Sequence, residues 1–171
     1  MELLVQSIKD VSAVGSSPML IVLAAGAALF LVSRHEVRRL GVLLLSLGSG
    51  LYSSLLKYIF TEPRPEGFVP TGFIPWERIL TPEVYSFPST HTVVYTAFFG
   101  YLFYLSFALR GVNKLVRNSA RSFCGVMLVF VGLSRVLLGA HFTKDVVAGY
   151  LFGLVYLGVL VVLDRSLVPR K

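Results

Sequence analysis

Long apolar runs, separated by short charged segments, dominate the chain. Five of these runs approach the length of about 20 mostly apolar residues that a helix needs to cross a bilayer. They lie at approximately residues 17–33, 40–60, 90–109, 120–139 and 145–163. The pattern predicts an all-α fold, in which a polytopic bundle of five membrane-spanning helices forms a single domain over residues 1–171.

The first residues follow a different pattern. Within residues 1–14, Leu4, Ile8 and Val11 recur at helical spacing, while charged and polar residues occupy many of the other positions. Such a pattern is typical of an amphipathic helix that lies on the membrane surface. We therefore predict an interfacial helix over residues 1–14, with a short sixth span as the alternative.

Composition supports a membrane protein and argues against an ordinary soluble domain and against nucleic-acid binding. With 55% hydrophobic side chains and a mean hydropathy of +0.75, the chain is more apolar than an ordinary soluble domain. The net charge of +7 could suggest nucleic-acid binding, but the basic residues form short clusters between apolar runs, as in cytoplasmic loops. Cys124 is the only cysteine and lies in an apolar run, which excludes an intrachain disulfide and a thiolate metal site.

The charged connections predict the orientation of the spans. Segments 34–39 and 110–121 and the tail from residue 164 carry more basic than acidic residues, so they should be cytoplasmic. Residues 61–83 hold two basic and four acidic residues, which favours an extracytoplasmic loop over residues 61–89. We expect a multi-pass protein of a bacterial-type inner (plasma) membrane, with its N-terminus outside and its C-terminus in the cytoplasm.

Strongly polar residues recur at the predicted outer ends of the spans. They form three blocks: Lys57-x6-Arg64-Pro65, Pro88-Ser89-Thr90-His91, and Ser134-Arg135-x5-His141-x3-Asp145. Ionisable groups at the ends of membrane spans are costly to place, so such a cluster indicates a functional site. Its three cations suit the three oxygens of a phosphoryl group, and backbone N–H groups at the start of the third span would add donors. We therefore expect an anionic ligand.

The three blocks, in this order and spacing, resemble the motifs of the type 2 phosphatidic acid phosphatase family. These are integral-membrane lipid phosphatases related to vanadium haloperoxidases, and the resemblance covers about half of the chain, from Lys57 to Asp145. Two differences from the family pattern are visible. The second block usually reads Pro-Ser-Gly-His, whereas this chain has Thr90 in place of the glycine. Family members also commonly have six spans.

The resemblance implies dephosphorylation of a membrane lipid phosphate or diphosphate, without metal or cofactor, through a phosphohistidine intermediate. His141 would be the nucleophile, Asp145 would orient it, and His91 would protonate the leaving oxygen. The remaining residues that match the motifs would bind the substrate phosphate: Lys57, Arg64, Ser89, Thr90 and Arg135. Candidate substrates are undecaprenyl diphosphate, phosphatidylglycerol phosphate, lipid A 1-phosphate and phosphatidic acid, and nothing in the spacing selects among them.

Three alternatives compete with this interpretation. A small transporter would place its ionisable groups near the bilayer midplane beside broken helices, whereas here they lie at the outer ends of the spans. A non-catalytic protein that binds anionic lipids would need the cations but not His141. A metal site built from His91, His141 and Asp145 is disfavoured, because the neighbouring cations would repel a divalent ion.

Overall fold

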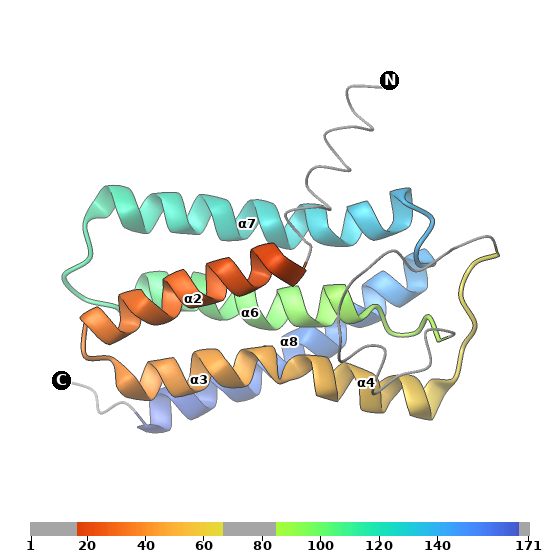
Figure 1. Cartoon of the computed structure of the whole chain (residues 1–171), viewed down its shortest axis with the longest axis horizontal. Coiled ribbons are helices and arrows are strands. Elements are labelled where there is room, and N and C mark those ends of the chain that lie inside the picture. The colour runs from red at the N-terminus through yellow and green to blue at the C-terminus, as the bar shows by residue number, and fades with distance from the viewer. Residues whose placement is uncertain (1–16, 67–84, 168–171) are drawn as a thin grey trace, which may run out of the picture.

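The computed structural model describes residues 17–66 and 85–167, and these residues form a bundle of helices that run along one long axis (Figure 1). The helices are α2 (Ser17–Ser33), α3 (Val37–Leu47), α4 (Ser49–Phe60), α6 (Thr90–Ala108), α7 (Lys114–Leu137) and α8 (Thr143–Leu167). Three helical stretches, Val37–Phe60, Lys114–Leu137 and Thr143–Leu167, are long and apolar enough to cross a membrane. The predicted all-α membrane bundle is thus confirmed. The helix predicted over residues 1–14 and most of the 61–89 loop fall outside the described residues.

Two of the predicted helices differ clearly from those observed. The run at 40–60 is divided between α3 and α4 at Gly48, whose N–H donates to the Leu45 carbonyl at 2.9 Å, as in a tightened last helical turn. Helix α7 begins at Lys114 rather than near residue 120, because the side chain of Asn113 accepts a hydrogen bond from Leu115 N at 2.7 Å and caps the helix. Hydropathy identifies only the apolar part of a helix. The residue that caps the helix can lie outside that part, so the helix is longer than the apolar run.

Helix α6 is the centre of the bundle. It packs against α3, α4, α7 and α8, and twelve of its nineteen residues are buried. Phe98, Phe99 and Tyr101 are fully enclosed. A helix that is apolar all round is expected to lie inside a protein or a membrane, and α6 lies inside this bundle.

Two glycines allow α6 and α8 to approach closely. A Cβ atom at Gly153 would lie 2.6 Å from Thr96 Cβ, and one at Gly149 would lie 2.8 Å from Thr92 Cβ. Small residues four apart are a common device for bringing membrane helices together. The close approach aligns the beginnings of the two helices, so that Ser89 N donates to the backbone carbonyl of Asp145 at 3.0 Å.

A buried polar cluster joins the helices at the other end of the bundle. Asp164, near the end of α8, accepts hydrogen bonds from the hydroxyls of Tyr101 at 2.8 Å and Tyr104 at 2.9 Å. Arg39 Nε of α3 lies 3.5 Å from the same carboxylate, at Oδ1. A buried charge is tolerated when it is paired and hydrogen-bonded, and here the pairing connects α3, α6 and α8.

The glycine contacts predict a difference between two alanine variants of α8. Gly153→Ala should destabilise the protein by about 1–3 kcal/mol, because its new methyl group would overlap Thr96 and force the helices apart. Gly158→Ala is the matched control, since a Cβ there meets nothing within 4 Å. The melting temperature in detergent should fall for the first variant and stay level or rise for the second. A Gly153→Ala protein that melts no lower than the control would contradict the close approach.

Candidate active site

The predicted site residues gather at one end of the bundle, where α4 ends, α6 begins, α7 ends and α8 begins (Figure 1). Lys57 lies in the last turn of α4 and Arg135 in the last turn of α7. Ser89, Thr90 and His91 lie at the start of α6. The structure therefore brings together three motif blocks that are far apart in the sequence.

A glycine turn at the end of α7 positions His141. Gly139 has φ of +65°, a left-handed conformation that favours glycine. Gly139 N donates to the Val136 carbonyl at 2.9 Å and Ala140 N donates to the Arg135 carbonyl at 3.0 Å, which is the hydrogen-bond pattern of a Schellman motif. His141 N also reaches the Arg135 carbonyl, at 3.3 Å. Backbone hydrogen bonds thus connect Arg135 and His141 of the third motif block. The His141 side chain is buried.

Asp145 is the third residue of α8, and its side chain is fixed by a hydrogen bond at the start of that helix. Its Oδ2 accepts a hydrogen bond at 3.0 Å from the N–H of Phe142, the residue before the helix, as the acidic residue of a capping box does. Residues four apart, such as His141 and Asp145, share one face if both lie in a helix. Instead, His141 precedes α8, and Nδ1 of His141 and Oδ2 of Asp145 approach to 3.5 Å because the cap turns the two side chains together.

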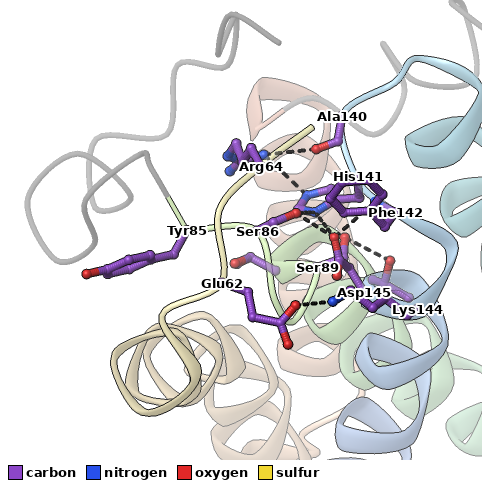
Figure 2. Close-up of polar contacts among 12 residues, drawn as sticks. Glu62, Arg64, Tyr85, Ser86, Ser89, Ala140, His141, Phe142, Lys144 and Asp145 are labelled. Carbon is purple, nitrogen blue, oxygen red and sulfur yellow. Dashed lines mark hydrogen bonds and ion pairs between the residues drawn. The ribbon is translucent and has the colours of Figure 1, made fainter. Parts of the chain in front are cut away.

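Ser86 lies between these two side chains, although no sequence motif predicted a role for it (Figure 2). Its Oγ is 3.1 Å from His141 Nδ1 and donates to Asp145 Oδ2 at 2.5 Å. Ser86 is fully buried. The sequence offers one signal for Ser86: it lies three residues before Ser89, which belongs to the second motif block.

Arg64 faces the opposite side of the imidazole. Its guanidinium Nη1 lies 3.5 Å from His141 Nε2 and donates to the Ala140 carbonyl at 3.2 Å (Figure 2). Two contacts of the neighbouring Glu62 fix the position of the segment after α4 that carries Arg64. The Glu62 carbonyl accepts from Ser86 N at 2.7 Å, and its carboxylate forms an ion pair with Lys144 of α8.

Three other predicted phosphate-binding residues lie at the same end of the bundle, each with a hydrogen bond inside it. Lys57 is buried, and its Nζ donates to the Tyr85 carbonyl at 2.7 Å. Thr90, at the position where the family usually has glycine, is also buried, and its Oγ1 accepts a hydrogen bond from Ser53 of α4 at 3.0 Å. Ser89 Oγ accepts from Thr92 at 3.1 Å.

His91 lies in the first turn of α6, with its ring stacked on Tyr95 at a centroid distance of 6.3 Å. Arg135, His141, Lys57 and Arg64 are all within electrostatic range of His91. Both predicted catalytic histidines and all three predicted cations therefore belong to one cluster. Within residues 17–66 and 85–167, no group of three or more His, Cys, Asp or Glu side chains could hold a metal ion.

Burial determines the charge state of His141. Removal from water lowers the pKa of its imidazole from 6.5 to about 4, against the hydrogen bond and charge of Asp145, which raise it. The charges of Arg64 and Lys57 lower the pKa further. His141 is therefore neutral at neutral pH, with cations in front of Nε2 and a carboxylate behind Nδ1.

Comparisons with known proteins show what the chain is similar to. The family model of the PAP2 superfamily matches residues 38–167. The chain is 37% identical to a lipid A 1-phosphatase of Rhizobium etli over 108 residues, which are 61% of this chain and 41% of that protein. It is 28% identical to phosphatidylglycerophosphatase B of Bacillus subtilis over 139 residues, which are 80% of this chain and 62% of that protein. The chain thus spans less than two thirds of the length of either relative.

A solved structure shares the fold. The crystal structure of a transmembrane PAP2 type phosphatidylglycerolphosphate phosphatase from Bacillus subtilis superimposes with a TM-score of 0.78 and 23% sequence identity. The superposition covers 100% of this chain and 81% of that one. Membrane spans in this chain and a membrane phosphatase as its structural neighbour identify a multi-pass membrane protein.

The electrostatic environment predicts opposite effects of two substitutions on His141. Arg64→Ala should raise the pKa of His141 because it removes a nearby positive charge, whereas Asp145→Asn should lower it further. Histidine-labelled protein titrated by NMR, with the signal assigned by its loss in His141→Gln, would measure both changes. The folded pKa is below 6.5, so the neutral His141 contributes stability above pH 6.5 that is lost as pH falls through about 4. Titration of the native His141 near 6.5, or shifts of both variants in one direction, would contradict this account.

Proposed function

The chain belongs to the PAP2 superfamily, and we propose that it is a lipid phosphatase that removes a terminal phosphate from a membrane lipid, without a metal, at the extracytoplasmic face. One observation carries this proposal: a buried, neutral histidine has a carboxylate behind one ring nitrogen and an arginine in front of the other. This arrangement suits a nucleophile that attacks an anionic phosphorus centre.

His141 Nε2 is the proposed attacking atom. The Arg64 guanidinium can only donate hydrogen bonds, so the Nε2 atom that it approaches at 3.5 Å carries the lone pair. Attack forms the Nε2–P bond as the bond between phosphorus and the lipid oxygen breaks. His91 gives the leaving oxygen a proton. Water then attacks phosphorus while His91 accepts a proton from it, the N–P bond breaks, and inorganic phosphate leaves.

Cations and neutral donors would stabilise the charge that develops during both steps. The equatorial oxygens of a transferring phosphoryl group carry most of this charge, and preorganised donors lower the barrier because they need no rearrangement. Arg64 and Arg135 can each present a planar fork to two oxygens, and Lys57 supplies a point charge. Ser89 and Thr90, at the beginning of α6, would add hydroxyl and backbone donors at the positive end of the helix dipole.

The names of two relatives suggest an order among the proposed substrates. These names refer to the 1-phosphate of lipid A and to phosphatidylglycerophosphate. We place these two lipids ahead of undecaprenyl diphosphate and phosphatidic acid. Release of inorganic phosphate from all four, with the purified protein in EDTA, tests both the reaction class and the order of preference.

Alanine substitutions at His141 and His91 should have different effects on activity. His141→Ala should abolish turnover and any covalent phosphoenzyme, because the attacking atom is gone. His91→Ala should lose most hydrolysis of lipids, whose alcohol leaving groups need a proton, yet retain much of the first step with an aryl phosphate. The phosphohistidine should accumulate in that variant and can be detected by mass spectrometry under alkaline quench. Equal losses on alkyl and aryl substrates, with no intermediate trapped in either variant, would exclude this division of roles.

The orientation of the site can be tested by labelling cysteines on intact cells. In a Cys124→Ala background, a cysteine at Glu66 should react with a membrane-impermeant maleimide, whereas one at Lys114 should react only after the membrane is permeabilised. Both positions are exposed in the structure, and they lie at opposite ends of the bundle. The reverse pattern would put the proposed site on the cytoplasmic side.

A further inference from the structure

We infer that Ser86 is a positioning residue that connects Asp145 to His141, so that the carboxylate acts on the imidazole through the serine hydroxyl. The inference deepens the proposed function and rests on it for its catalytic consequence. It starts from two distances. His141 Nδ1 is 3.1 Å from Ser86 Oγ but 3.5 Å from Asp145 Oδ2. The nearer partner of the imidazole is the hydroxyl.

The placement of protons around Ser86 follows from what each group can donate. Two oxygens 2.5 Å apart need a proton between them, and an ionised carboxylate has none to give, so Ser86 donates to Asp145. A serine hydroxyl carries one proton. Because that proton is engaged with Asp145, Ser86 Oγ can only accept from His141, and Nδ1 must carry a hydrogen.

The contact on the other side of the ring favours the same tautomer, but more weakly. Arg64 approaches Nε2 at 3.5 Å, at the long end of hydrogen-bond distances, and a guanidinium has no acceptor, so the contact suits an unprotonated Nε2. Both ring nitrogens therefore have partners that favour one neutral form, with hydrogen on Nδ1 and the lone pair on Nε2. That is the form that a nucleophilic Nε2 requires.

The position of Ser86 is fixed from several directions. Its backbone N–H donates to the Glu62 carbonyl at 2.7 Å, and the carbonyl of the preceding Tyr85 accepts from Lys57 Nζ at 2.7 Å. Ser89, three residues further on, is hydrogen-bonded to the backbone of Asp145. The hydroxyl has little freedom to move away from the histidine, and the residue is completely shielded from water.

This connection matters most when His141 attacks. The imidazole gains positive charge as the N–P bond forms, while the hydrogen remains on Nδ1. The chain from Nδ1–H through Ser86 O–H to Asp145 Oδ2 would stabilise that charge without transferring a proton. Loss of Ser86 should therefore slow formation of the phosphoenzyme whatever the leaving group, unlike loss of His91.

Activity assays with a matched control test the inference. Ser86→Ala should lower kcat roughly 10- to 100-fold on both lipid and aryl phosphates, with KM within about threefold, as expected for loss of a hydrogen bond to a charged group. Ser46→Ala is the control, because Ser46 is equally buried but donates to the Leu43 carbonyl in α3, away from the site. It should retain wild-type kcat.

A double-mutant cycle and a spectroscopic measurement distinguish a relay from simple packing. If Asp145 acts through Ser86, then Ser86→Ala combined with Asp145→Asn should be no more than about threefold slower than the slower single variant. Multiplicative losses would show that the two side chains act separately and would overturn the relay. A melting temperature for each variant identifies any loss that comes from unfolding.

The tautomer of His141 gives a readout that does not depend on turnover. In histidine ¹⁵N-labelled protein, Nδ1 should be the protonated nitrogen, and Ser86→Ala should convert the ring to a mixture of tautomers while Ser46→Ala should not. An unchanged tautomer in Ser86→Ala, or kcat within threefold of wild type, overturns the inference. If the wild-type protein releases phosphate from no lipid, the proposed function fails, and the tautomer measurement still decides whether Ser86 positions His141.

Discussion

The buried carboxylate of Asp145 is the interaction on which the geometry of the site depends. A charge in an apolar bundle is tolerated only if donors surround it. The donors here come from Phe142 N–H and from Ser86 of the segment before α6, with His141 Nδ1 close by. The same residue accepts from Ser89 through its backbone. These side-chain contacts all reach Oδ2, so one carboxylate oxygen ties together the start of α8, the segment before α6 and the histidine.

Helix α8 carries a buried aspartate at each end, and the different donors give the two ends different properties. Asp164 accepts hydrogen bonds from two tyrosine hydroxyls and is approached by Arg39, and these contacts join three helices. Asp145 instead faces a serine hydroxyl and a neutral imidazole, whose second nitrogen is the proposed attacking atom. The close α6–α8 packing at Gly149 and Gly153 keeps the two ends in register. The same interaction can thus close the bundle at one end and serve a reactive group at the other.

The sequence predicted the helical class, the approximate positions of the helices and the convergence of the motif blocks, because lipid solvation imposes apolar runs and makes ionisable groups rare. It did not predict the break at Gly48 or the start of α7 at Lys114, because backbone hydrogen bonds and the Asn113 cap decide these boundaries and hydropathy does not register them. Ser86 was missed for a related reason. Serine is common, and its partners lie 55 and 59 residues away along the chain, so only the folded arrangement reveals its role.

Thr90 shows how a departure from a family pattern can be accommodated. A glycine at this position would leave space beside the proposed phosphate site, whereas threonine fills it with a buried methyl group and hydroxyl. An unpaired buried hydroxyl would be costly, but Ser53 of α4 donates to Thr90 Oγ1 at 3.0 Å. The contact with Ser53 satisfies the Thr90 hydroxyl. In the proposed mechanism this hydroxyl would add a donor to a phosphate oxygen, which a glycine side chain could not provide.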